Sequence, residues 1–181
     1  MPPPPVELPL ALTIGPDQIR DLDLSPLAPL AEAPVASLVA AAAQLDLELI
    51  WPRLDDDPRE LSQVAEVRLW CLRADALHPW LPLLLERSNG SLTRHAAMLL
   101  PHGFSRSEGI RFAPESLELW ITHRLFWLDA WSIGAEVSCR QGLAQMAAVL
   151  GFELDAAFWL PAGLPTGLPA GLPAGLPLAE S

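Results

Sequence analysis

The residues best suited to chemistry in this chain of 181 residues are four histidines and two cysteines. His95, His102 and His123 could converge on a zinc ion, because zinc takes imidazole nitrogens as ligands. They lack the tight spacing of a ligand motif, so three structural histidines are the simpler interpretation. Cys71 beside a histidine could form a nucleophilic pair. Its apolar neighbours favour an inert thiol instead.

A run of three carboxylates, Asp55, Asp56 and Asp57, could bind a divalent metal ion. No second acidic cluster follows at ligand spacing, so a solvated acidic turn is the better interpretation. The chain has no phosphate-binding glycine loop and no CxxC, HExxH or GxSxG motif. We therefore predict no catalytic residue, no metal site and no cofactor. The alternative is an enzyme or small-molecule-binding domain whose pocket is lined by His95, His102, His123 and Arg111.

Charge and cysteine content narrow the class of protein further. The net charge is −11, which repels nucleic acid backbones and disfavours DNA or RNA binding. Two cysteines are too few for a disulfide framework and favour a reduced, intracellular compartment. The proline-rich start resembles neither a secretory signal nor a transit peptide. No window of 18 apolar residues free of proline and charge could span a bilayer.

The elements that must position these side chains follow from hydrophobic periodicity. We expect strands at 8–14, 45–51, 67–72, 93–100 and 109–113. We expect helices at 34–44, 79–87, 114–134 and 138–151, and a last turn at 155–160. This pattern predicts a single α+β domain over residues 8–160, with a mixed or antiparallel sheet of about four to five strands packed against helices. Residues 1–7 and the LPAG repeats of 161–181 should be disordered tails.

The helix expected at 114–134 is the longest and carries apolar residues on two sides. One face holds Leu117, Ile121 and Leu128; the opposite face holds Leu119, Phe126, Ala130 and Ile133. A helix with two apolar faces is either central in its own domain or half covered by a partner. We favour the central position.

Arg124 projects from the larger apolar face of this helix. Arginine stays charged, so a buried Arg124 needs a carboxylate partner. Asp57 and Glu60 are the expected partners in a buried ion pair.

Several segments together resemble a known family. They are DPREL (57–61), HPWLP (78–82), AAMLLPH (96–102), EGIRF (108–112), PESLELWITHRLF (114–126) and LAQMAAVLGFELDAAFW (143–159). Their order and spacing resemble the chlororespiratory reduction 6 family of cyanobacteria and chloroplasts, over about residues 12–160. The proline-rich start and the LPAG repeats depart from its pattern.

The resemblance implies a soluble, non-catalytic assembly factor for the photosynthetic NAD(P)H dehydrogenase-like complex, a relative of respiratory complex I. It implies action on the hydrophilic arm through a ferredoxin-like iron–sulfur subunit, with no cofactor of its own. The missing transit peptide points to a cyanobacterial type, in the cytoplasm with peripheral thylakoid contact. A permanent subunit of the same complex is an alternative to a transient factor.

A protein of this kind must present a surface to another chain. Arginine and tryptophan dominate binding hot spots, and both are concentrated in residues 57–131. The tryptophans could instead be core residues, and the arginines members of internal ion pairs. The expected partner-binding residues are Arg59, Arg68, Trp70, Trp80, His102, Arg111 and Trp127.

Overall fold

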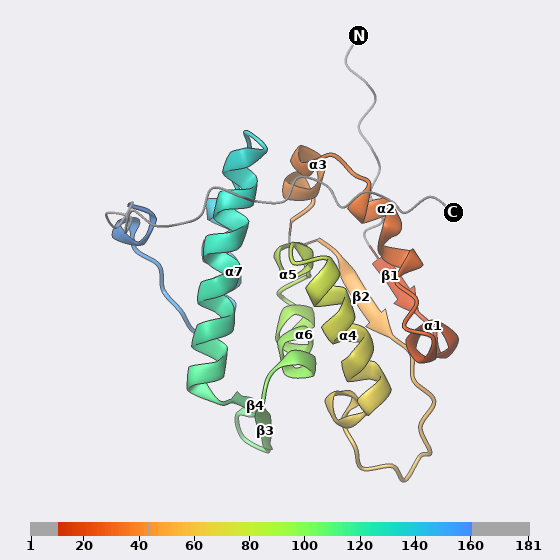
Figure 1. Ribbon diagram of the computed structural model, residues 1–181. Helices are drawn as coiled ribbons and strands as arrows, with labels where there is room; N and C mark the ends of the chain where they lie inside the picture. The colour runs from red at the N-terminus through yellow and green to blue at the C-terminus, as the bar shows by residue number, and fades with distance from the viewer. Residues whose placement is uncertain (1–10, 43, 161–181) are drawn as a thin grey trace.

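The computed structural model describes residues 11–42 and 44–160, and these form one α+β domain, as the sequence predicts (Figure 1). The expected tails at 1–7 and 161–181 lie outside the described residues. The first half contains β1 (Ala11–Ile14), α1 (Pro16–Arg20), η1 (Ser25–Leu27), α2 (Ala28–Ala31), α3 (Val35–Ala40), β2 (Asp46–Leu49), η2 (Leu61–Gln63) and α4 (Ala65–Leu77). The second half contains α5 (Leu81–Leu84), α6 (Ser91–Leu99), β3 (His102–Ser105), β4 (Gly109–Phe112), α7 (Pro114–Gly134), α8 (Arg140–Val149) and η3 (Ala156–Trp159).

The strands pair two by two. β1 and β2 are parallel, with Leu12 opposite Leu47, and β3 and β4 form an antiparallel hairpin, with His102 opposite Phe112. The expectation of one sheet of four to five strands is therefore wrong. The described residues hold two separate two-stranded sheets, because two of the expected strands are helices.

The first of these is α4, which replaces the strand expected at 67–72. Val67, Trp70, Cys71 and Ala74 are buried, at the i, i+3, i+4 and i+7 positions of one helical face. Leu69, which should have shared a strand face with Val67, points to solvent. The alternation over six residues was too short to separate the two periods.

The second is α6, which replaces the strand expected at 93–100. It begins after Gly90, whose φ of 77° lies in the left-handed region that glycine tolerates. Leu92, His95 and Ala96 are buried on its inner face. A short apolar run such as this one fits a strand or a buried helix equally well by periodicity alone.

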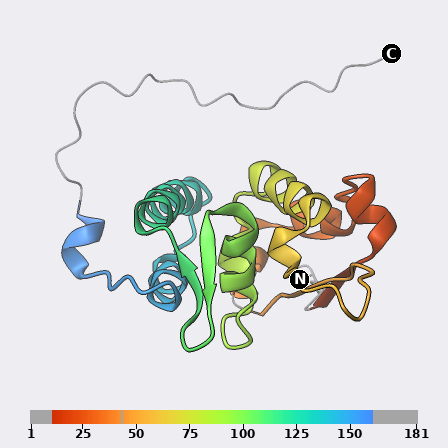
Figure 2. The ribbon, with the colours of Figure 1, turned by 90° about the horizontal axis from the view of Figure 1, so that it is seen from below.

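Trp70 lies at the centre of the hydrophobic core and is fully buried. Its indole Nε1 donates a hydrogen bond to the backbone oxygen of Asp23 at 2.8 Å, which ties α4 to the N-terminal segment. α4 and α6 occupy the middle of the molecule, with the β1–β2 sheet and α1 on one side and α7 and α8 on the other (Figures 1 and 2). No described helix has the length and apolar content to cross a membrane.

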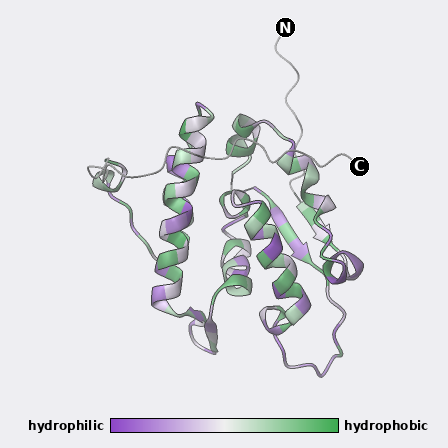
Figure 3. Ribbon diagram, in the orientation of Figure 1, coloured by the Kyte–Doolittle hydropathy of each residue, from purple (hydrophilic) through white to green (hydrophobic). Residues whose placement is uncertain are grey.

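α7 begins and ends where the sequence predicts, and it shows hydrophobic segments along its whole length (Figure 3). Its first apolar face packs into the core through Ile121, Leu125 and Leu128. The second face lies at the surface: the side chains of Leu119 and Ile133 are exposed.

Candidate functional site

A buried cluster of charged side chains joins three helices. Asp75 of α4 accepts hydrogen bonds from Arg124 of α7 and, at 3.3 Å, from Nε2 of His95 of α6. Nε2 of His95 must carry the proton, because an ionised carboxylate can only accept. All three residues are buried. The cluster therefore fixes α4, α6 and α7 to one another.

The environment of Asp75 keeps it ionised. Burial alone would raise the pKa of Asp75, but the hydrogen bond from His95 and the charges of His95 and Arg124 outweigh it, so the pKa lies below its usual value. Arg124 also lies over the ring of Trp120, with its Cζ 5.9 Å from the ring centroid. This contact adds a cation–π attraction to the ion pair.

The pairing of Arg124 corrects the sequence-based expectation. A buried Arg124 does have a carboxylate partner, but the partner is Asp75 and not Asp57 or Glu60. Asp57 pairs with Arg59 at 2.7 Å on the surface, which lowers the pKa of Asp57 to about 2. Asp75 was missed because it was placed after a strand. On a helix it follows Cys71 by four residues and shares its buried face.

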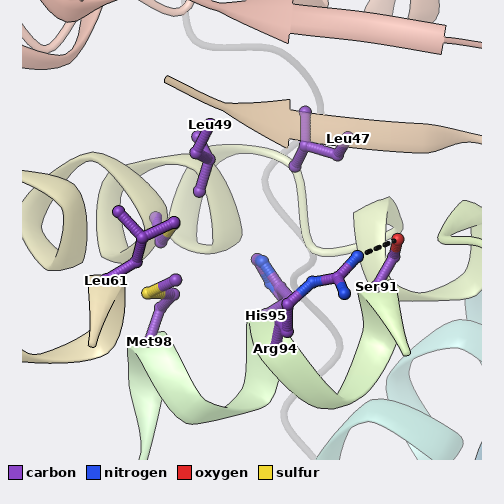
Figure 4. Close-up of a pocket in the computed structure, with 8 residues that line it drawn as sticks. Leu47, Leu49, Leu61, Ser91, Arg94, His95 and Met98 are labelled. Carbon is purple, nitrogen blue, oxygen red and sulfur yellow. Dashed lines mark hydrogen bonds between the residues drawn. The ribbon is translucent and has the colours of Figure 1, made fainter. Parts of the chain in front are cut away.

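His95 also lines a small cavity (Figure 4). Leu47 and Leu49 of β2 form one wall, and His95 and Met98 of α6 lie opposite. Its volume is about 50 Å³, far below the roughly 300–1,000 Å³ of a small-molecule site. The lining residues are Leu47, Leu49, Leu61, Cys71, Ser91, Arg94, His95 and Met98.

The Cys71 thiol shares this cavity with His95, and the three candidate histidines lie on three different elements. Burial, with a smaller effect from the charge of Asp75, raises the pKa of the Cys71 thiol to about 12, so it stays protonated at neutral pH. His95 lies in the core, His102 lies on the hairpin, and His123 is exposed on α7. Within residues 11–42 and 44–160, no three His, Cys, Asp or Glu side chains could jointly hold a metal ion.

A larger groove, of about 510 Å³, runs beside β3. Two of the expected partner-binding residues, Arg68 and His102, line it together. Its lining residues are Ser62, Gln63, Arg68, Leu100, Pro101, His102, Gly103 and Phe104. Phe104, which was not predicted, is 47% exposed and offers the groove an aromatic surface. No signal in the sequence marked it, because β3 itself was missed.

Hydrogen bonds hold the polar side chains of this groove in place. Nδ1 of His102 donates to the backbone oxygen of Leu100 at 2.9 Å, and Nε2 of His102 shares a hydrogen bond with the Ser62 hydroxyl at 3.0 Å. Nε of Arg68 donates to the backbone oxygen of Met98 at 3.1 Å. Both expected residues thus have structural partners as well as access to the groove.

Among residues 11–42 and 44–160, no backbone group pairs with β3 on the side away from β4. The amide of Ala113 donates to the oxygen of Pro101 at 3.0 Å, which makes Pro101 and Ala113 a hydrogen-bonded pair. Antiparallel pairs alternate, so His102 and Phe104 do not exchange hydrogen bonds with β4. Their N–H and C=O groups point to the free edge of the hairpin.

The remaining expected partner-binding residues do not join this groove. Trp70 and Trp80 are core residues and cannot meet a partner without disrupting the fold. Arg59 lies on an exposed loop.

Arg111 pairs with Glu108 at 3.2 Å, on the face of the hairpin opposite His102. Trp127 is half-buried on α7 and stacks on Trp131 with ring centroids 6.2 Å apart.

Comparison with known proteins identifies the family and not the fold. No solved structure matches this chain. The family model described as chlororespiratory reduction 6 matches residues 14–160, which cover the buried cluster, the groove and α7. The match agrees with the resemblance carried by the segments from DPREL to the closing helix. The chain therefore belongs to the chlororespiratory reduction 6 family.

Proposed function

We propose that this protein acts in assembly of the hydrophilic arm of the photosynthetic NAD(P)H dehydrogenase-like complex by binding a ferredoxin-like iron–sulfur subunit in the groove beside β3. Membership of the family implies involvement in assembly of this complex. The partner and the binding groove are our proposal. It acts as a binding factor that makes and breaks no covalent bond.

The open backbone edge of β3 is the observation that carries this proposal. An extended segment of a partner can add to an unpaired strand edge, where main-chain hydrogen bonds supply affinity and side-chain pockets supply specificity. The N–H and C=O groups of His102 and Phe104 provide that edge. Phe104 provides an apolar surface, and Arg68 provides positive charge within the same groove.

The contact suits a factor that leaves after assembly. β3 offers only four residues for pairing, and short interfaces favour weak, reversible complexes. A permanent subunit would instead be recovered in equal amount with the mature complex. We place the protein in the cytoplasm, with peripheral contact at the thylakoid membrane.

The test is binding of the purified ferredoxin-like subunit to the full chain. Phe104→Asp places a charge in the groove and should weaken binding at least about tenfold. Leu77→Asp is the matched control, because Leu77 is also an exposed apolar residue but lies at the C-terminal end of α4. The control should bind as the unchanged protein does. Circular dichroism checks that both variants remain folded.

Equal binding by the Phe104→Asp and unchanged proteins would show that the groove is not the docking site. No binding by the unchanged protein to either the apo or the cluster-loaded subunit would remove the partner from the proposal. Recovery of the protein in a one-to-one ratio with the mature complex would favour the permanent subunit.

A further inference from the structure

We propose that the solvent face of α7 is a second docking surface, which binds a basic amphipathic helix of a partner protein. This surface is separate from the groove beside β3, and its occupant is defined by chemistry and not by family membership. The residues that form it are Leu119, His123, Phe126, Ala130 and Ile133, here called the α7 seam.

The spacing of the α7 seam is that of a helix-pairing surface. Its members follow one another by four, three, four and three residues, which is the spacing of the a and d positions in a coiled coil. All five side chains are exposed. Leu119 is 74% exposed, Phe126 59% and Ile133 58%. A row of large apolar side chains in water on one helix face is typical of a binding site.

The length of the α7 seam suits a helix of similar size. From Leu119 to Ile133 it extends about 21 Å at 1.5 Å per residue. The indole rings of Trp120 and Trp127 are half-buried along one side of it. Leu119 and Phe126 occupy d positions of the heptad. Trp120 and Trp127 directly follow them, at the flanking e positions, and widen the apolar surface.

The charges beside the α7 seam are acidic. Glu115 and Glu118 are exposed on α7, and Glu136 is exposed two residues beyond its C-terminal end. Asp129 is already paired with Arg140 at 2.8 Å. Arg124, the one arginine of α7, is buried in its pair with Asp75. Flanking charges select partners in paired helices, so the partner helix should carry lysine or arginine beside its apolar row.

A second copy of this chain fits the α7 seam poorly. Antiparallel pairing about Phe126 would place Leu119 against Ile133 of the other copy, which is favourable. It would also bring the end of α7, which Glu136 follows by two residues, close to Glu115 of the other copy, and like charges repel. Each copy carries a net charge of −11, which adds to the repulsion.

The chain's own C-terminal residues also lack the required charge. Residues 161–181 contain no basic residue, and Glu180 is their one charged side chain. Within the described residues, Phe158 of η3 stacks on Phe126 with ring centroids 5.3 Å apart. It leaves Phe126 mostly exposed and does not cover Leu119 or Ile133. An aromatic ring from outside the helix thus already packs on the centre of the α7 seam.

Site-directed photo-crosslinking tests which occupant is correct. The photoreactive residue p-benzoylphenylalanine replaces Leu119 or Ile133 of the full chain, in cells that assemble the complex. It replaces Leu54 in the control, because Leu54 is 78% exposed in the loop that follows β2. We expect crosslinks from positions 119 and 133, absent at 54, to a different protein. The crosslinked segment should have apolar residues at spacings of three and four, flanked by lysine or arginine.

Crosslinks to a second copy, to residues 161–181, or to a partner segment without basic residues would each overturn the proposal. So would crosslinks no stronger than those of the Leu54 control. The Phe104→Asp variant separates this surface from the groove. If it abolishes binding of the iron–sulfur subunit yet leaves the crosslinks at 119 and 133 unchanged, the two surfaces are distinct.

A charge-swap experiment tests the chemistry directly. The probe is a synthetic 21-residue helical peptide with leucine and alanine at its seam positions and lysine at its flanks; its twin carries glutamate at the flanks. The unchanged protein should bind the lysine peptide at least about tenfold more tightly than the glutamate peptide. Glu115→Lys with Glu118→Lys should reverse this preference. Equal binding of both peptides by both proteins would exclude a charge-selected partner.

Discussion

Arg124 of α7 and Asp75 of α4 form an ion pair inside the core, with both side chains almost fully removed from solvent. Through Asp75 the pair extends to His95 of α6. The pair holds one face of α7 against α4 and leaves the α7 seam facing water. Since a buried charge is costly unless it is paired, this contact specifies how α7 is rotated about its axis.

Breaking the pair should be strongly destabilising. Asp75→Asn leaves the Arg124 guanidinium buried without an anion, and this should cost about 3–5 kcal/mol of unfolding free energy. Replacing both partners, as Asp75→Leu with Arg124→Met, should cost less than Asp75→Asn alone. Urea unfolding followed by circular dichroism measures both. A loss below about 1 kcal/mol for Asp75→Asn would show that the pair is dispensable.

The same pair predicts a pH dependence of stability. The folded-state pKa of Asp75 is lowered from 3.8, so its contribution is complete above the unfolded pKa and is lost as pH falls through the folded pKa. The difference in unfolding free energy between the unchanged protein and Asp75→Asn should shrink as pH falls below about 4. Thermal melts from pH 7 to pH 2.5 would measure it. A difference that persists at the lowest pH would mean that Asp75 stays ionised there or contributes by packing.

Hydrophobic periodicity was enough to find the long elements but not all the short ones. The 21 residues of α7 span almost six turns, so its bounds were predicted correctly. The stretches around Trp70 and His95 read as strands, because a few alternating apolar residues fit both periods. For α4, the apolar spacing of Val67, Trp70, Cys71 and Ala74 already contained the helical period. These four residues span eight positions, whereas the alternation that favours a strand covers only six.

The candidate site was predictable only in part, for a related reason. A charged residue on an apolar helix face signals a buried partner, and Arg124 was recognised in that way. Which carboxylate meets it depends on how helices far apart in sequence pack, and periodicity carries no information about that. Trp70 was indistinguishable from a surface tryptophan once α4 was misassigned. Phe104 lines the groove, and β3 has an open edge, only because a hairpin forms there.

Cys71 should be unreactive in the folded protein. Burial raises the pKa of its thiol to about 12, and the thiolate is the nucleophile. Cys139 is also buried, and burial raises the pKa of its thiol too. At pH 8 a thiol reagent such as 5,5′-dithiobis(2-nitrobenzoate) should therefore release no colour rapidly, and two equivalents after addition of urea. Fast modification of Cys71 in the native state would support the alternative in which Cys71 and a histidine form a nucleophilic pair.

Trp70 should be the tryptophan least tolerant of substitution. Trp70→Phe removes the donor to the backbone oxygen of Asp23 and leaves a cavity, which together should cost about 2–4 kcal/mol. Trp127→Phe is the control, because Trp127 is only half-buried, and it should cost less than about 1.5 kcal/mol. Urea midpoints compare the two variants. Equal losses would mean that the bond to Asp23 does not anchor the N-terminal segment.

Binding at the α7 seam should depend on salt more strongly than binding in the groove beside β3. The acidic flanks Glu115, Glu118 and Glu136 are solvent-exposed, and exposed charges are screened beyond about 8 Å at physiological ionic strength and beyond about 3 Å at 1 M. Raising the salt from 0.05 to 0.5 M should weaken binding of the lysine-flanked peptide several-fold. Strand addition at β3 relies on main-chain hydrogen bonds, so binding of the iron–sulfur subunit should change less over that range.

Isothermal titration calorimetry on the full chain measures both, with the Glu115→Lys and Glu118→Lys double variant as the control. If the lysine peptide binds equally well at both salt concentrations, apolar contact alone holds it, and the acidic flanks of α7 do not choose its partner.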